Sequence, residues 1–147
     1  MNNKLLPHDY DSEAGLLAAA FCPGGLDNIK GLVSADDFYS SSANLIFGKM
    51  TEFHESGRNY TPSLVDQTLE GHSQYEDIRR ALDVLVPITA TIAPHFAQIV
   101  RELADRRRAI KASSEVLEGL FDLSKAIPRA RGFLRVEVPG MLMEVIP

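Results

Sequence analysis

The stretch that decides the fold is residues 94–122, PHFAQIVRELADRRRAIKASSEVLEGLFD. It contains no proline after Pro94, and its only glycine, Gly119, lies near its end. Apolar residues recur in it at every seventh position: Phe96, Leu103, Ile110 and Leu117. This spacing predicts one long helix with an apolar stripe along one face, as in helical bundles and helical hairpins. A stripe of this length needs a surface to pack against.

Length and composition are those of an ordinary globular domain. The 147 residues can form one domain with a core. Hydrophobic residues make up 45% and charged residues 24%, and the net charge of −5 disfavours duplex DNA binding as the sole role. The single cysteine, Cys22, cannot form an internal disulfide and favours a reducing compartment. No apolar run reaches the length of a membrane span, so we expect a cytoplasmic protein without membrane contact.

The rest of the chain predicts a helical bundle. Helical patterns with start or stop signals cover about residues 11–21, 26–33, 41–56, 61–70 and 75–86. The apolar connection ITATIA, residues 88–93, is interpreted as an ordered loop, because we find no second strand to pair with it. We expect an all-α fold of about six helices: a globular helical subdomain over residues 1–93, then a long interface helix over residues 94–125.

The C-terminal segment, residues 126–147, has a different pattern. Pro128, Gly132, Pro139 and Gly140 forbid a continued helix. FLRVEV, residues 133–138, alternates apolar and charged residues as a lone strand would. We expect an irregular tail here.

No catalytic or cofactor-binding motif is found in the sequence. The only Gly-Lys pair, Gly48-Lys49, is followed by Met50 and lies in a predicted helix, so it is not a phosphate-binding loop. The single cysteine has no nucleophile signature. No metal-ligand spacing joins the four histidines, His8, His54, His72 and His95. We therefore expect no catalytic residue, no metal and no cofactor.

One basic cluster, Arg106–Arg108, lies within the long helix. Consecutive helical residues point about 100° apart, so three arginines do not form a flat patch. Arg107 falls near the apolar stripe, where its stem can lie on the core while its head is paired. Glu102 and Arg106 have the spacing of an ion pair. A solvated, salt-bridged face is therefore favoured over nucleic-acid contact.

Several segments in order resemble the N-terminal domain of DnaB-type replicative helicases of bacteria and phages. The similar segments are PHDYDSEAGLL (7–17), ADDFY and then IFGKM (35–50), ESG with LE (55–70), and IVRE with Arg107 and Ile110 (99–110). The resemblance covers about residues 5–122. Asn44 stands where the family usually has histidine, and Tyr60-Thr61 replaces Ile/Val-Asp. The family's second antiparallel helix and its ATPase motor have no counterpart in this sequence.

The resemblance implies a non-catalytic collar domain that pairs into dimers, assembles as a trimer of dimers and docks primase. The expected partners are a second copy, primase, helicase or helicase loader. We expect the partner-binding residues along the long helix, at Phe96, Ile99, Val100, Leu103, Arg107, Ile110, Leu117 and Phe121. Two alternatives remain open: a stand-alone, phage-derived regulator that binds a host helicase or loader, or the collar of an intact ATP-dependent helicase.

Overall fold

The computed structural model describes residues 5–86, 88–126, 135–138 and 141–144. The chain divides into two compact units, Met1–Arg107 and Arg108–Pro147. Their boundary lies within one long helix rather than at residue 93, where the sequence suggested that the globular part ends.

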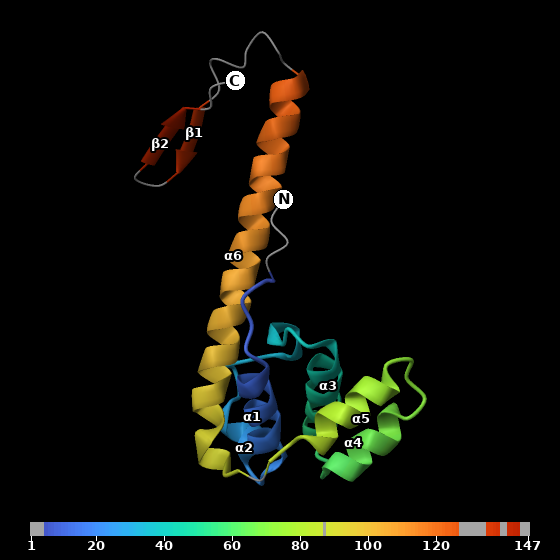
Figure 1. The fold of residues 1–147 in the computed structure, drawn as a ribbon. Coiled ribbons are helices and arrows are strands. Elements are labelled where there is room, and N and C mark those ends of the chain that lie inside the picture. The colour runs from blue at the N-terminus through green and yellow to red at the C-terminus, as the bar shows by residue number, and fades with distance from the viewer. Residues whose placement is uncertain (1–4, 87, 127–134, 139–140, 145–147) are drawn as a thin grey trace. The chain divides into compact units, whose positions relative to one another are not determined.

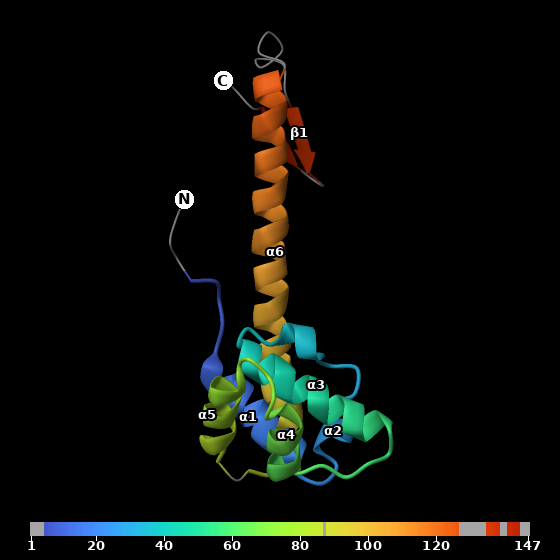
Figure 2. The same cartoon turned by 90° about the vertical axis from the view of Figure 1, so that its right-hand side faces the viewer.

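The first unit is a bundle of short helices (Figures 1 and 2). Helix α1 packs against α2, α3 and the 3-10 turn η2, and α3 packs against η1, α4 and α5. The last element of the unit is the first part of the long helix α6. The elements are α1 Tyr10–Phe21, α2 Gly25–Asn28, η1 Ala35–Asp37, α3 Ser41–Glu55, α4 Pro62–Leu69, α5 Tyr75–Asp83, η2 Ala90–Ile92 and α6 Ala93–Ala126.

Local capping chemistry explains where these helices begin. The Asp9 carboxylate accepts the Ser12 backbone N–H at 3.1 Å, and Thr61 Oγ1 accepts that of Leu64 at 3.1 Å ahead of Pro62. The sequence offers Asp9, Asp11 or Ser12 as the cap of α1, and the structure shows Asp9 in that role; the cap at Thr61 ahead of Pro62 is the one that the sequence predicts. Two predicted helices are too long, because α2 ends at Asn28 and α5 at Asp83. The chain after α2 reaches Gly31, whose φ of 81° is left-handed and cannot continue a helix.

The core of the first unit lies among α1, α3, α4, α5 and the first part of α6, and its largest fully buried apolar side chains are Leu16, Leu17, Ile29, Ile46, Met50, Val65, Ile78 and Val100. At the end of α1, Cys22 Sγ donates to the Ile88 carbonyl at 2.8 Å, so this thiol is paired in the fold. Tyr60 Oη donates to the Ala20 carbonyl at 2.9 Å. Burial, with Asp27 nearby, raises the pKa of Tyr60 to about 12.

The second unit contains the rest of α6 and two short strands, β1 Arg135–Val138 and β2 Met141–Glu144. The strands pair antiparallel, with Arg135 opposite Glu144 and Val138 opposite Met141. We expected an irregular tail over residues 126–147, and this prediction was wrong for the two strands. The partner strand MLME was missed because its residues do not alternate between apolar and polar. Apart from this pair of strands, the predicted all-helical fold with a long C-terminal helix is confirmed. None of the described helices is long and apolar enough to cross a membrane.

Candidate interaction face on the long helix

Helix α6 buries a stripe of mostly small residues in the core of the first unit. Ala93 and Ala97 are fully buried, and Val100 and Ala104 are 2% exposed. At about 100° per residue these four positions share one narrow arc of the helix. Small side chains let the helix axis come close to its neighbours. The ring of Phe96, beside this stripe, lies on Gly15 of α1, where an added Cβ would fall 2.6 Å from the ring.

The predicted apolar stripe is a different face of the same helix. Six of the eight predicted partner-binding residues lie within an arc of about 60°, centred about 100° around the helix from the buried stripe. We name this face the seam; it consists of Phe96, Ile99, Leu103, Ile110, Leu117 and Phe121. The first three are half-buried, whereas Ile110 is 44%, Leu117 63% and Phe121 61% exposed.

The other two predicted residues have roles inside the first unit. Val100 belongs to the buried stripe. Arg107 is half-buried and lies between the seam and the buried stripe. Its guanidinium makes two hydrogen bonds: Nη1 donates to the Pro7 carbonyl at 3.0 Å, and Nη2 to the Asp37 carbonyl at 2.7 Å. It also lies 5.4 Å from the centre of the Tyr39 ring. A single side chain thus joins the segment before α1, residues Leu5–Asp9, which we name the N-terminal arm, to the turn η1 and the middle of α6.

A second apolar group on α6 was not predicted as a group. Val116 and Leu123 are exposed and Leu120 is half-buried. Their spacing of four and three residues places them together, about 120° around the helix from the seam. The same spacing rule, applied to the sequence, would have found them. The second half of α6 therefore offers two apolar faces, enough for two packing contacts.

Beside Arg107, a buried carboxylate organises the start of α3. Glu13 is 3% exposed, and its two oxygens accept the backbone N–H groups of Tyr39 at 2.9 Å and Ser40 at 3.1 Å. Burial raises the pKa of this carboxyl, while these two donors, Arg107 and His8 act in the opposite direction. From the sequence alone, Glu13 is an acidic residue in the first turn of a helix, where its charge is favourable. Which distant N–H groups it would bind is set by the tertiary fold.

The same corner holds an aromatic cluster. The ring of His8 is stacked on that of Tyr39, with centroids 4.2 Å apart and planes 10° apart, and Tyr10 lies 4.6 Å from His8. His8 Nδ1 is also 2.7 Å from the Leu6 carbonyl oxygen. This histidine therefore holds the N-terminal arm in place through ring packing.

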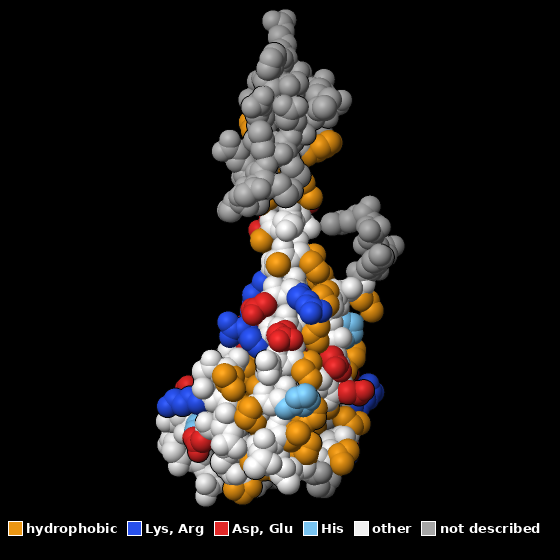
Figure 3. All heavy atoms as spheres, turned by 90° about the vertical axis from the view of Figure 1, so that its left-hand side faces the viewer, with side chains coloured by type: hydrophobic (Ala, Val, Ile, Leu, Met, Phe, Trp, Pro, Cys, Tyr) orange, Lys and Arg blue, Asp and Glu red, His pale blue; other side chains and the backbone are white. Residues whose placement is uncertain are grey.

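Charged residues are dispersed over the helix face. Figure 3 shows Lys and Arg side chains interspersed with Asp and Glu side chains on the side where α6 lies. Arg106 and Arg108 are exposed while Arg107 is half-buried, so the triplet does not form one flat patch, as predicted. The predicted pair of Glu102 with Arg106 was wrong. The neighbouring Arg101 pairs with Asp105 at 3.2 Å instead.

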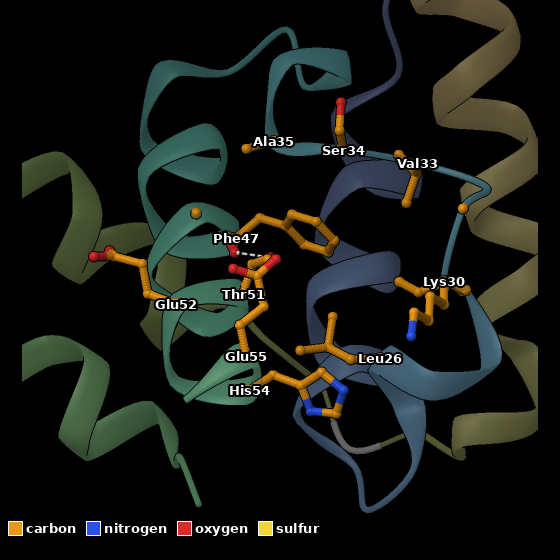
Figure 4. A pocket seen from close by; sticks show the side chains of 13 residues that line it. Leu26, Lys30, Val33, Ser34, Ala35, Phe47, Thr51, Glu52, His54 and Glu55 are labelled. Atoms are coloured by element: carbon orange, nitrogen blue, oxygen red, sulfur yellow. Dashed lines mark hydrogen bonds between the residues drawn. The ribbon is translucent and has the colours of Figure 1, made fainter. Parts of the chain in front are cut away.

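A separate hollow of about 680 Å³ lies between α3 and the segment from Leu26 to Ala35 (Figure 4). Its walls are apolar at Leu26 and Phe47, and Lys30 and Glu55 reach it from opposite sides. This mixture does not indicate one class of ligand. In the part of the chain that the structure describes, no cluster of three His, Cys, Asp or Glu side chains is arranged to hold a metal ion.

Comparison with known proteins identifies the fold and the family. The sequence model of the DnaB-like helicase N terminal domain matches residues 5–104. The replicative DNA helicase DnaB of Buchnera aphidicola subsp. Baizongia pistaciae is 29% identical over 123 residues, which are 80% of this chain and 26% of that protein. The chain thus spans about a quarter of this relative's length.

A solved structure agrees with the sequence match. The crystal structure of the N-terminal domain of DnaB helicase from Mycobacterium tuberculosis matches with a TM-score of 0.72 at 21% identity, over 86% of this chain and 94% of that one. At this identity the likeness shows the fold alone. The family match covers more than half of the residues, which confirms the predicted resemblance. The chain belongs to the DnaB-like helicase N-terminal domain family.

Proposed function

We propose that the chain is a non-catalytic collar domain that self-associates through the seam of α6 and docks primase or a helicase loader in DNA replication. The observation that carries this proposal is the exposure of large apolar residues in regular helical positions, at Ile110, Leu117 and Phe121. Exposed apolar patches of this kind mark protein–protein contacts. Most of the stability of a helix in a protein comes from packing of its apolar face, so a packing partner would stabilise the exposed part of α6.

The seam has the features of a helix-pairing surface. Its heptad-spaced positions at Phe96, Leu103, Ile110 and Leu117 suit packing against another helix. Ile110, Leu117 and Phe121 lie beyond residue 104, where the family match ends, so their role rests on their own exposure and spacing. Because this chain continues after α6 into β1 rather than into a second long helix, we propose that a second copy supplies the packing helix.

The partner proteins are proposed from the family alone. The Buchnera relative is a replicative helicase, and the chain corresponds to only about a quarter of it. The sequence contains no phosphate-binding loop, since its only Gly-Lys pair is followed by methionine. We therefore propose that the chain binds helicase, primase or loader as separate proteins or domains, and that it does not itself supply their activity.

Light scattering across a concentration series tests self-association, and a pull-down with purified primase tests docking. We expect a dimer or larger oligomer and retention of primase. Leu117→Asp should reduce both, whereas Lys111→Asp, at an exposed position on another side of the helix, should reduce neither. A strict monomer without affinity for primase or helicase would contradict the proposal.

One observation favours the alternative of a stand-alone regulator that binds a host helicase or loader. After α6 the chain forms the β1–β2 hairpin, which differs from the second helical arm implied by the family resemblance. Titration into a helicase unwinding assay separates the two roles, because only a regulator should inhibit the motor. A Walker A motif in the reading frame downstream of Pro147 would instead identify the chain as the collar of an intact helicase.

A further inference from the structure

The N-terminal arm, residues Leu5–Asp9, precedes α1 (Figure 1) and contacts α6 through Arg107. The Pro7 carbonyl accepts one hydrogen bond from Arg107, and the His8 ring stacks on Tyr39. At the start of the arm, Leu5 is 76% exposed. At its other end the arm continues into the Asp9 cap of α1. Between these two ends Leu6, Pro7 and His8 are half-buried, so the arm is fixed at its Asp9 end and exposed at its Leu5 end.

Arg107 is the fixed half of this contact. If the arm left, the guanidinium would keep its 2.7 Å hydrogen bond to the Asp37 carbonyl and its position over Tyr39. Opening the arm therefore does not leave a half-buried cation without a partner, which would be costly. The Pro7 carbonyl would exchange its bond for one to water. These conditions suit a segment that opens and closes while the remainder of the unit stays folded.

The arm is attached about midway along the proposed interaction face, at one edge of it. Arg107 is four residues after Leu103 and three before Ile110, so the three side chains are neighbours on one side of α6. Within the seam, Leu103 is half-buried, whereas Ile110 is 44% exposed. A helix packing along the whole seam would have to pass the place where Pro7 contacts Arg107.

We propose that the arm is a strap that closes the middle of the seam, and that the α6 of a second copy displaces it in order to pack along the full face. This inference rests on the self-association proposed above. Since the arm and the second copy would compete for the same stretch, the apparent affinity of association is the intrinsic affinity multiplied by the fraction of time that the arm is open. Removing the arm should therefore expose Leu103 and tighten association together.

The test uses the full chain with Cys22→Ser and Leu103→Cys, and measures the rate at which a maleimide labels position 103 at a concentration where the chain is monomeric. Deletion of residues 1–8 removes the Pro7 and His8 contacts but keeps the Asp9 cap. Deletion of residues 1–4 is the matched control, because it keeps every named contact of the arm. His8→Ala removes the ring contacts with Tyr39 and Tyr10 and the contact with the Leu6 carbonyl but keeps the Pro7 contact, and provides a second variant should the longer deletion impair folding.

We expect labelling about threefold faster after deletion of residues 1–8, a smaller increase for His8→Ala, and no change for the control. Self-association should become several-fold tighter in the same order. Equal labelling rates in all variants would show that the arm does not cover position 103, and would overturn the proposal. Faster labelling with unchanged association would show that the arm does not compete with a second copy, and would also overturn it. If no variant associates at any concentration, the proposed self-association is wrong, and the second copy is not the competitor. Faster labelling in that case would show only that the arm covers position 103.

Discussion

The two halves of α6 differ in what they present, although they form one helix. In the first unit, Ala93, Ala97, Val100 and Ala104 are buried and no larger than valine. In the second unit, Ile110, Leu117, Phe121 and Leu123 are all larger than valine and at least 43% exposed. The first half is therefore packed against its own chain, where space is short. The second half carries the side chains that gain most from burial, with much of their surface still exposed to water.

This difference separates stability from association. Substitutions in the buried stripe should unfold the first unit, whereas substitutions in the exposed part of the seam should change binding and leave folding intact. Arg107 lies at the boundary of the two units and should affect the fold and the arm only moderately. The predictions below begin with the largest expected effect.

Val100→Asp should destabilise the chain by at least about 3 kcal/mol, because a buried charge has no partner there. Val100 is 2% exposed. Urea unfolding followed by circular dichroism measures the loss. The matched variant Ile110→Asp, on the exposed half of the helix, should stay within about 0.5 kcal/mol of the original chain. Equal losses for the two variants would remove the distinction between the halves.

Ala97→Leu should cost about 1–3 kcal/mol, since the buried stripe has no room for three more carbon atoms. Ala97 is fully buried, whereas Ala109 in the second half is exposed. Ala109→Leu is therefore the control, and should change the unfolding free energy by less than about 0.5 kcal/mol. If both variants proved neutral in thermal unfolding, close packing along this stripe would not be what positions α6.

Ile110→Asp should weaken self-association at least about tenfold, which corresponds to about 1.4 kcal/mol. Because Ile110 is 44% exposed, we expect the folding of the monomer to be retained. Sedimentation equilibrium measures the association. An unchanged oligomer would show that the seam is not the interface.

Arg107→Lys should destabilise the first unit by about 1 kcal/mol, because an ammonium cannot reproduce the planar fork that reaches two carbonyls. Hydrogen exchange should also become faster in the arm around Pro7. The neighbouring Arg106 is exposed, and Arg106→Lys should change neither quantity. Unaltered exchange in both variants would mean that the guanidinium does not hold the arm.

Glu13 should give the smallest effect, a pH dependence. Because burial raises its pKa in the folded chain above the ordinary value of 4.5, the folded chain binds more protons than the unfolded one just above that pH. The contribution of Glu13 to stability is therefore greatest below pH 4.5 and falls as the pH rises through the raised value. Glu13→Gln does not titrate, so unfolding curves of the two proteins across this range should diverge in that direction; parallel curves would contradict it.

Much of the fold could be predicted from the sequence, because its signals are local. The caps at Asp9 and Thr61, the N1 proline Pro62 and the left-handed Gly57, with φ of 73°, act within one helical turn. The strand β2 was missed, since MLME has no alternation and becomes a strand only through pairing with β1. The extended helix predictions after α2 and α5 failed because apolar spacing alone does not show where a helix ends.

The candidate site was predicted in part. Heptad spacing found the seam, because spacing along a helix determines which residues share a face. It also included Val100, since spacing does not show which of two adjacent faces the core will cover. The hydrogen bonds of Glu13 to Tyr39 and Ser40, and those of Arg107 to Pro7 and Asp37, join residues 26 to 100 positions apart. No local pattern predicts such contacts.

By itself the sequence determined that α6 is one long helix with an apolar seam, because helical periodicity is a property of consecutive residues. Only the tertiary structure decided that the narrow alanine stripe, rather than the seam, is buried in the first unit. The physical reason is close packing: the alanines allow near approach to the bundle, as Gly15 does beneath Phe96, while the larger seam residues stay partly or largely exposed. The long helix therefore has a side for its own core and another side on which we propose that a partner binds.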